Sequence, residues 1–438
     1  MIESWQTLDL LSTLVDKSLV VYETDADGVG RYRMLESVRQ YAQDRLHESG
    51  EGKQIRQAHR AFQLQLWEGL GEQINGPEQA RVLAELEAEH DNLRIAMEAD
   101  APSDEHDADR MRLAIAAEGF FNARGFYSEG RGWLMELLSQ PTPTVPLLRA
   151  RALNIAGALA WRQGDYAAAR AILEEARPLW TELGDAKGLR HALTSLANVL
   201  WYQGEHEQAE PVYEEVLSLT RKFGEKAQVA GALNNIALVA QAKGEYERAR
   251  AYYEEALTIR RERGDTRGIA NILGNLSQTL IGMGDTEAAR PLIAESMEIR
   301  RTLGDRLGVA YTLQYTGRIA LGDGDADAAQ KAFAESLVLR QELGEKWGFI
   351  ICFSCFADLA VFRQEEIRAV RLWAAEETLR QAIGAAFPPT EREARDKRLA
   401  EMRTVLGDDV FEEAWVAGRE WTTEQAIAFA LNDKPNTP

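Results

Sequence analysis

Two cysteines have the spacing that comes closest to a reactive or metal-binding pair. Cys352 and Cys355 form a CxxC motif, which occurs in zinc sites and in dithiol redox centres. They lie within the apolar run at residues 349–356, and no nearby histidine or second cysteine pair would complete a zinc site. We interpret both as buried apolar residues. Because the chain has only these two cysteines, it has no disulfide framework, which fits a reducing cytoplasm.

A glycine-rich segment and the histidines are the other candidates for chemistry. Residues 50–54, GEGKQ, share only a Gly-Lys pair with a phosphate-binding loop: His47 replaces its first glycine, and Gln54 replaces the residue that would hold Mg²⁺. The histidines show no ligand or triad spacing: His59, His90, His191 and His206. We therefore expect no catalytic residues, no metal, no cofactor and no enzymatic activity.

A Gly-acid dipeptide that recurs every 20 residues determines the predicted architecture. Each glycine suits the left-handed residue that ends a helix, and each acid suits the N-cap of the next helix. One helical hairpin therefore takes 40 residues, and such a period predicts a solenoid. Ten pairs keep the phase: Gly164-Asp165, Gly184-Asp185, Gly204-Glu205, Gly224-Glu225, Gly244-Glu245, Gly264-Asp265, Gly284-Asp285, Gly304-Asp305, Gly324-Asp325 and Gly344-Glu345.

The helices carry a second pattern, in which an alanine and a large apolar residue follow the turn glycine by five and nine positions. The pairs are Ala169 and Leu173, Ala209 and Tyr213, Ala249 and Tyr253, Ala289 and Ile293, Ala329 and Phe333, Ala369 and Trp373. This pattern, and the segment GEYERARAYYEEAL at residues 244–257, resembles the tetratricopeptide repeat (TPR). Five repeats are clear over residues 149–344. In a degenerate sixth, Gln364 replaces the turn glycine, so we expect an altered turn.

The first 48 residues follow a different pattern. Two β-rich runs at residues 18–23 and 31–35 form a predicted hairpin between helices at 8–15 and 36–47, an order that resembles the end of a winged helix. The segments LLSTLVDKSLVVYE, RYRMLESVRQYAQDRL and EHDNLRIAME are similar to bacterial STAND regulators, transcription-linked ATPases with a nucleotide-binding core, a winged helix and a helical-repeat sensor. That core is missing here, so the resemblance implies an upstream nucleotide-binding domain as a partner.

Together these patterns predict an all-α fold: a right-handed TPR superhelix (α-solenoid) of 40-residue hairpins with a small winged-helix-like α/β remnant. The predicted domains are the remnant at 1–48, a helical arm with a degenerate first repeat at 49–145, the TPR array at 146–383, and capping helices with a tail at 384–438. In the arm we expect helices at 54–74 and 78–99. In the cap we expect helices at 391–406, 409–419 and 423–431.

Charge and hydropathy exclude two classes of partner. The net charge of −20 argues against binding of nucleic acid by the whole chain, and no apolar run of about 18 residues would cross a membrane. Asp25 and Asp27 at the wing tip disfavour DNA contact by the remnant, so we expect no direct nucleic-acid binding and a cytoplasmic protein. The basic residues that would have to reach DNA are Lys17, Arg31, Arg33 and Arg39.

The resemblance to TPR proteins implies a ligand groove on the concave surface, lined by the first helix of each hairpin. Amide side chains there could hold the backbone of an extended peptide, because they both donate and accept hydrogen bonds. The alternative is a solvated polar helix face. Trp161 and Trp201 are either anchors in the groove or packing residues between hairpins. The candidate groove residues are Arg151, Asn154, His191, Thr194, Asn198, Trp201, Asn234, Gln241, Asn271, Gln278, Tyr311, Gln314 and Arg318.

The leading functional hypothesis is the sensor half of a STAND-type signalling or transcriptional regulator, which binds a peptide segment or a small inducer in its groove. The alternative is a free-standing TPR adaptor that bridges two proteins. The two differ in whether the N-terminal remnant contacts a nucleotide-binding core.

Overall fold

The computed structural model describes residues 4–24, 30–74, 76, 78–98, 107–140, 145–224, 226–383 and 389–432. The chain divides into two compact units, residues 1–148 and 149–438. The predicted wing tip with Asp25 and Asp27 lies outside the described residues. No helix of the described residues is long and apolar enough to cross a bilayer.

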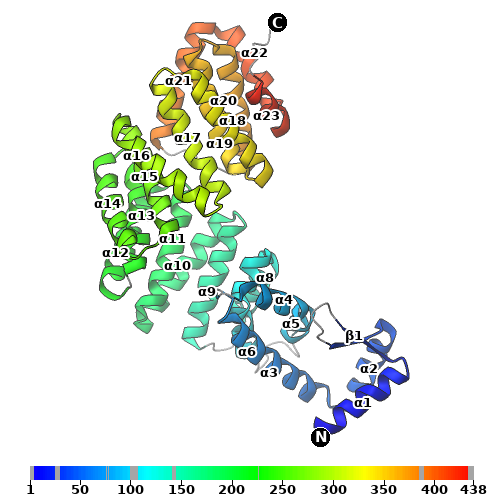
Figure 1. The fold of residues 1–438 in the computed structure, drawn as a ribbon. Coiled ribbons are helices and arrows are strands. Elements are labelled where there is room, and N and C mark those ends of the chain that lie inside the picture. Colours follow the sequence, from blue (N-terminus) through cyan, green and yellow to red (C-terminus); the bar gives the residue numbers. More distant parts are fainter. Residues whose placement is uncertain are drawn as a thin grey trace. The chain divides into compact units, whose positions relative to one another are not determined.

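The first unit begins with the predicted hairpin between two helices. Strands β1 (Val20–Thr24) and β2 (Gly30–Met34) pair antiparallel, with Tyr22 opposite Tyr32. Helices α1 (Ser4–Asp16) and α2 (Glu36–Ser49) flank them along the chain (Figure 1). The remaining helices are α3 (Gly52–Gly71), α4 (Gln79–Ala88), α5 (His90–Met97), α6 (Asp107–Ala116), α7 (Glu118–Arg124) and α8 (Tyr127–Leu138).

The prediction of one helix over residues 78–99 is wrong, because α4 and α5 are separate helices that meet at Glu89. The Glu89 carboxylate pairs with Arg31 at 3.1 Å and accepts a hydrogen bond from Asn92 at 2.8 Å. Two buried arginines hold the end of α5: Arg60 donates to the carbonyl of Ala96 at 2.9 Å, and Arg110 donates to that of Met97 at 2.9 Å. Local periodicity could not reveal this break, since its partners come from other elements.

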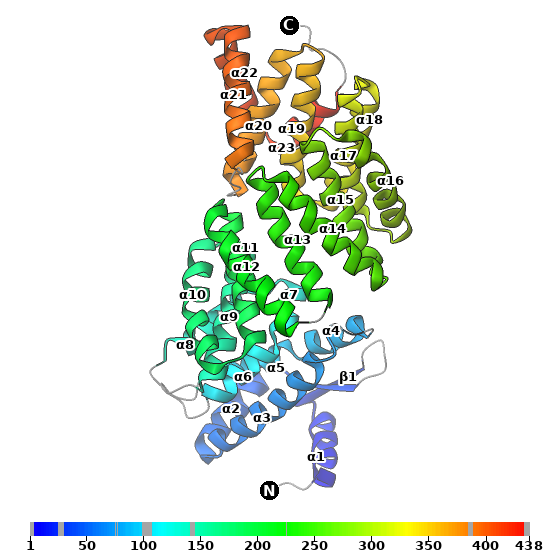
Figure 2. The ribbon, with the colours of Figure 1, turned by 90° about the vertical axis from the view of Figure 1, so that its left-hand side faces the viewer.

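The second unit contains six helical hairpins stacked in chain order, followed by three helices (Figure 2). The hairpins are α9 (Pro146–Arg162) with α10 (Tyr166–Leu183), α11 (Ala186–Tyr202) with α12 (His206–Phe223), α13 (Lys226–Ala242) with α14 (Tyr246–Glu262), α15 (Thr266–Gly282) with α16 (Thr286–Thr302), α17 (Arg306–Gly322) with α18 (Ala326–Leu343), and α19 (Lys346–Phe362) with α20 (Glu366–Ile383). The solenoid predicted from the 20-residue period is confirmed.

Nine of the ten repeated glycines take the predicted left-handed backbone, with φ between 64° and 86°. Gly224 is the exception, at φ −96°. The altered turn predicted for the sixth repeat is wrong. Gln364 adopts φ 59°, and its amide and that of Glu365 donate to Val361 and Ala360 at 3.0 and 2.8 Å, as the equivalent amides do around Gly324. The two turn hydrogen bonds therefore hold a side-chain-bearing residue in a conformation that normally favours glycine.

The acid after each glycine caps the next helix most often when it is aspartate. Asp165, Asp265 and Asp325, for example, accept a hydrogen bond from the amide three residues ahead. Glu205 and Glu245 make no such bond, although Glu345 does. The shorter carboxylate reaches the first-turn amides more readily, which explains why aspartate predominates at these turns.

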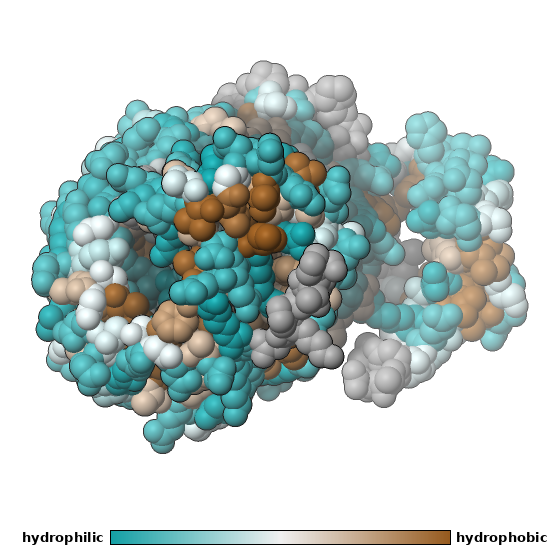
Figure 3. Space-filling view, turned by 90° about the horizontal axis from the view of Figure 1, so that it is seen from above, coloured by the Kyte–Doolittle hydropathy of each residue, from teal (hydrophilic) through white to brown (hydrophobic). Residues whose placement is uncertain are grey.

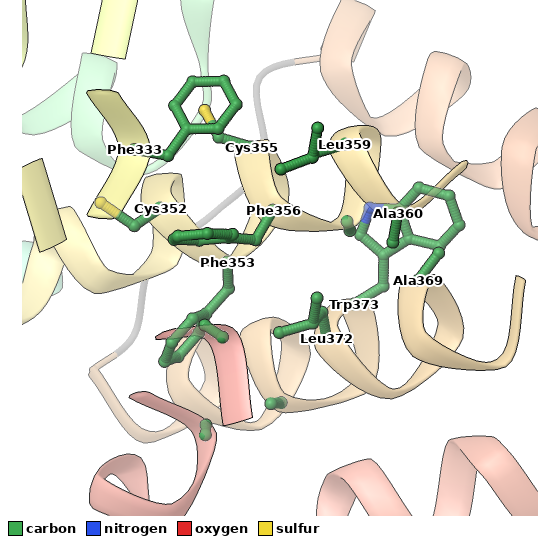
Figure 4. Packing of buried hydrophobic residues seen from close by; sticks show 14 of the residues in the cluster. Phe333, Cys352, Phe353, Cys355, Phe356, Leu359, Ala360, Ala369, Leu372 and Trp373 are labelled. Atoms are coloured by element: carbon green, nitrogen blue, oxygen red, sulfur yellow. The ribbon is translucent and has the colours of Figure 1, made fainter. Parts of the chain in front are cut away.

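The last two hairpins enclose a continuous apolar cluster in which both cysteines lie (Figure 4). Cys352 and Cys355 are each 1% exposed and pack among aromatic residues such as Phe333 and Phe356. Burial raises the pKa of the Cys352 thiol to about 12 and also raises that of Cys355. Both thiols are therefore protonated and enclosed, as packing residues would be.

The array ends in α21 (Pro389–Leu406), α22 (Asp408–Arg419) and α23 (Thr423–Leu431), which match the three predicted C-terminal helices. Helix α22 packs along α20, and α23 packs against α19 and α20. Arg368 of α20 donates to the carbonyls of Phe429 and Ala430 at 3.1 Å, which satisfies the end of α23. The surface seen from above is mostly hydrophilic, with confined apolar patches (Figure 3).

We predict that Gln364→Gly stabilises the repeat unit by about 0.5–1 kcal/mol. Removing the side chain relieves the strain of the left-handed conformation, which is roughly 1–2 kcal/mol, but it also raises the conformational entropy of the unfolded chain. The midpoint of urea unfolding, followed by circular dichroism, should rise. The reverse substitution, Gly324→Gln at the equivalent turn, should lower it. An unchanged midpoint in both variants would show that these turns carry no strain.

Candidate functional site

The first helices of the third to sixth hairpins build one continuous face of the second unit. Successive first helices touch one another: α13 with α15, α15 with α17, and α17 with α19. Two cavities open along this face. The central cavity lies among α13, α15 and α17 and has a volume of about 480 Å³. The distal cavity lies mainly among α17, α19, α20 and α21 and has a volume of about 790 Å³.

The structure brings part of the predicted groove together. Six candidate residues line the cavities: Asn234, Asn271 and Tyr311 the central one, and Gln278, Tyr311, Gln314 and Arg318 the distal one. Seven line neither of these two: Arg151, Asn154, His191, Thr194, Asn198, Trp201 and Gln241. Apart from Gln241, the candidates from α13, α15 and α17 are therefore the ones that line a cavity, whereas those from α9 and α11 line neither.

Most of the candidate amides also make hydrogen bonds inside the array. Their oxygens accept from residues of the same hairpin or of the next one, so these amides contribute to cohesion of the solenoid. The bonds run from Trp180 to Asn154 at 3.0 Å, from Tyr213 to Asn198 at 2.6 Å, from Asn275 to Asn234 at 2.9 Å, from Thr279 to Gln241 at 2.9 Å, and from Tyr315 to Gln278 at 3.1 Å.

Both tryptophans of the first helices have aromatic neighbours. The ring of Trp161 lies 5.8 Å from that of Tyr202, and Trp201 lies 4.5 Å from His206. Tyr202 also meets Trp347 of α19 edge-on at 6.4 Å. These contacts correspond to the packing alternative, and neither tryptophan lines the two cavities.

Sequence reasoning missed the arginines of the second helices. Arg260 and Arg300 line the central cavity, and Arg380 lines the distal one. Together with Arg340 they recur every 40 residues, a signal that the sequence does contain. The distal cavity also receives Arg395 and Arg398 from α21, which no repeat pattern could have placed there.

Charges in the distal cavity are closely paired. Arg380 pairs with Glu376 and Arg395 with Glu377, each at 2.9 Å. Arg398 forms an ion pair with Asp358. Burial raises the pKa of Asp358, and the neighbouring Arg398 and Arg318 oppose that rise. The cavity thus combines positive and negative groups in roughly balanced amounts.

The groove presents amide, phenol and guanidinium groups. Its tyrosines are kept neutral, because burial raises the pKa of Tyr315 to about 12 and also raises that of Tyr311. Among the described residues, no cluster of three or more His, Cys, Asp or Glu side chains could hold a metal ion. Amides, phenols and guanidinium groups suit recognition of polar groups on a ligand.

In the first unit, two of the basic residues considered for DNA contact have protein partners. Arg31 donates to the carbonyl of Ala88 at 2.9 Å besides its pair with Glu89, and Arg39 pairs with Glu36 at 2.8 Å. The absence of direct nucleic-acid binding stays a prediction.

Two protein families match this architecture. Residues 148–222, 228–302 and 268–342 match the tetratricopeptide repeat, and residues 1–47 match a winged helix-turn-helix domain. The chain contains TPR repeats behind an N-terminal winged helix. A "Putative HTH-type transcriptional regulator" of Mycobacterium tuberculosis is 33% identical over 202 residues, which make up 44% of this chain and 22% of that protein. An uncharacterized protein of M. tuberculosis is 49% identical over 53 residues, 12% of this chain and 13% of that one.

Two solved structures of Rap proteins share the fold of this chain. The apo form of RapI has a TM-score of 0.54 at 14% identity, and the match covers 63% of this chain and 98% of RapI. A Rap protein complexed with Competence and Sporulation Factor has a TM-score of 0.51 at 13% identity, over 74% of this chain and 98% of that one. This chain is homologous in sequence to putative HTH-type transcriptional regulators, and the matched region spans about a fifth of their length.

We predict that Asn198→Ala lowers the free energy of unfolding by about 1–3 kcal/mol, because it leaves the buried Tyr213 hydroxyl without its acceptor. Urea unfolding measures the change. Adding Tyr213→Phe should recover part of the loss, since the stranded hydroxyl is then gone. If the double variant is no more stable than Asn198→Ala alone, the hydrogen bond is not the cause.

Proposed function

We propose that this TPR protein is the ligand-sensing half of a STAND-type transcriptional regulator and that it binds an extended peptide segment along the face formed by α13, α15 and α17. The observation that carries the proposal is the pair of cavities on that face, each of which combines apolar surface with polar side chains. Their amide, phenol and guanidinium groups match the alternating donors and acceptors of a peptide backbone. Homology to HTH-type regulators supports a regulatory setting for this binding.

A chain of the same fold offers a precedent for a bound partner. The Rap protein of TM-score 0.51 was solved complexed with Competence and Sporulation Factor. A cavity of about 480 Å³ lies within the size range of ligand sites in proteins. Because each hydrogen bond contributes only about 0.5–1.5 kcal/mol net, several hairpins must act together to hold a flexible segment.

The first unit supports a second contact, with an upstream nucleotide-binding core. Helix α2 buries none of its side chains, and Leu35 and Tyr41 are 53% and 60% exposed. Tyr22 and Tyr32 on the hairpin are also exposed. Large exposed side chains of this kind are common at interaction surfaces. In the proposed regulator, ligand binding by the repeats alters how the winged helix meets that core.

A tryptophan placed in the groove tests the binding proposal. Asn271→Trp puts a bulky ring on an exposed position of the central cavity, whereas Ser218→Trp puts the same ring on the exposed surface between α12 and α14. In a random hexapeptide display library, the unaltered protein should enrich peptides whose retention falls about tenfold or more in Asn271→Trp, equivalent to ~1.4 kcal/mol. Ser218→Trp should retain them. If the unaltered protein enriches no peptide, or if Asn271→Trp retains them equally, the groove does not bind peptides.

The adaptor alternative predicts a different size for the natural gene product. The test is an immunoblot of the source cells with an antibody raised to the repeats. If a nucleotide-binding core lies upstream, the antibody should detect a product much larger than the 48.9 kDa of this chain. A band at 48.9 kDa would contradict the STAND-type proposal and favour a free-standing adaptor.

A further inference from the structure

The central cavity combines two guanidinium groups with neutral polar groups. Arg260 and Arg300 line it together with the amides of Asn234, Asn271 and Asn275, and no carboxylate is among its described lining residues. Arg260 already forms an ion pair with Asp265, as the arginines of the distal cavity do with their own carboxylates, so Arg300 is the weakly paired cation of the central cavity.

Arg300 is a buried cation whose partners are mostly neutral. Its side chain is 7% exposed and donates to Ser296 at 3.1 Å, to the carbonyl of Ala270 at 3.3 Å and to Asn271 at 3.2 Å. Its paired carboxylate, Asp305, lies 3.9 Å away, beyond hydrogen-bond distance. Burial lowers the pKa of Arg300, which reflects this incomplete compensation of its charge. A nearby anion would supply the missing compensation.

One repeat position controls how far each of these arginines is covered. This position holds Gly231 in the third repeat, Asn271 in the fourth and Tyr311 in the fifth. The Tyr311 ring covers Arg340 at 4.1 Å, and Arg340 also pairs with Glu345 at 2.5 Å. Asn271 covers Arg300 only through one hydrogen bond.

The two glycines on this face leave room in front of the cavity arginines. A Cβ atom added at Gly231 would meet only Arg260, at 3.9 Å, and one added at Gly274 would lie 3.4 Å from Arg300. Glycine inside a helix lowers stability by roughly 1 kcal/mol relative to alanine. At these two positions the absence of a side chain leaves space beside the guanidinium groups of Arg260 and Arg300, so that a ligand can approach them closely.

We infer that the central cavity is a receptor for a carboxylate: an acidic side chain of the bound segment, held by Arg300 and the surrounding asparagine amides, beside Arg260, which Asp265 already pairs. Charge-assisted hydrogen bonds from a guanidinium to a carboxylate are short and strong, and a partly desolvated site strengthens them further. This inference rests on the proposed function and adds to it the chemical class of the ligand.

The test compares two matched hexapeptide pools, identical except that a scanned position carries Glu in one pool and Gln in the other. The unaltered chain should bind the Glu pool about tenfold more tightly at one position. Arg300→Gln should abolish that preference. Asn271→Asp should do the same, because it places a carboxylate beside Arg300 at a position exposed enough to leave the fold intact. The matched control is Arg301→Gln, which removes the same charge from an exposed neighbour outside the cavity and should keep the preference.

The outcomes separate the two proposals. Equal binding of both pools by the unaltered chain, or an unchanged preference in Asn271→Asp, overturns the carboxylate receptor and leaves peptide binding in place. Retention of neither pool overturns the proposed function, and the inference with it. Glutarate serves as a free dicarboxylate probe in a thermal-shift assay. If it stabilises the unaltered chain but not Arg300→Gln while neither pool binds, the anion is a small molecule and not part of a segment.

Discussion

The repeat unit depends on one tight turn, used again and again. In it, a left-handed residue lets two amides return to the end of the preceding helix, as those of Gly324 and Asp325 do to Leu321 and Ala320 at 3.1 and 2.9 Å. Because the turn inside each of the six hairpins has nearly the same geometry, the two helices of every hairpin pair in a similar way. Positions that share a repeat phase therefore fall on the same face, and a linear period becomes a continuous surface.

The polar residues of that surface hold the helices together, and this role limits how they can bind a ligand. Asn198 accepts from Tyr213, and Gln278 accepts from Tyr315 of the next hairpin, so these amides already hold helices together. A buried polar group without a partner is costly, which is why polar residues on the inner helices are bonded to neighbours. A ligand has to compete with these bonds or use the donors and acceptors that they leave over.

The arginines of the second helices likewise differ in role, since some join hairpins and others line a cavity. Arg340 is fully covered by Tyr311 and Glu345, and its role is to join one hairpin to the next turn. Arg300 occupies the same repeat position, but a smaller residue faces it and its carboxylate is farther away. With a smaller facing residue and a more distant carboxylate, Arg300 lines a cavity, whereas Arg340 is covered.

The sequence alone determined the class of fold, because a 20-residue period of turn residues and a matching pattern of small and large residues are local signals that survive without long-range information. It also identified the N-terminal hairpin and the three C-terminal helices. It failed where a contact from another element decided the outcome. At the helix break, the Glu89 carboxylate pairs with Arg31 from the N-terminal hairpin. The turn at Gln364 was missed for a different reason, because local backbone hydrogen bonds to Val361 and Ala360 hold the left-handed conformation without a glycine. Only the tertiary structure decided which polar residues share a cavity, since the placement of Arg300 opposite Asn271 and of α21 beside α20 follows from how whole helices pack.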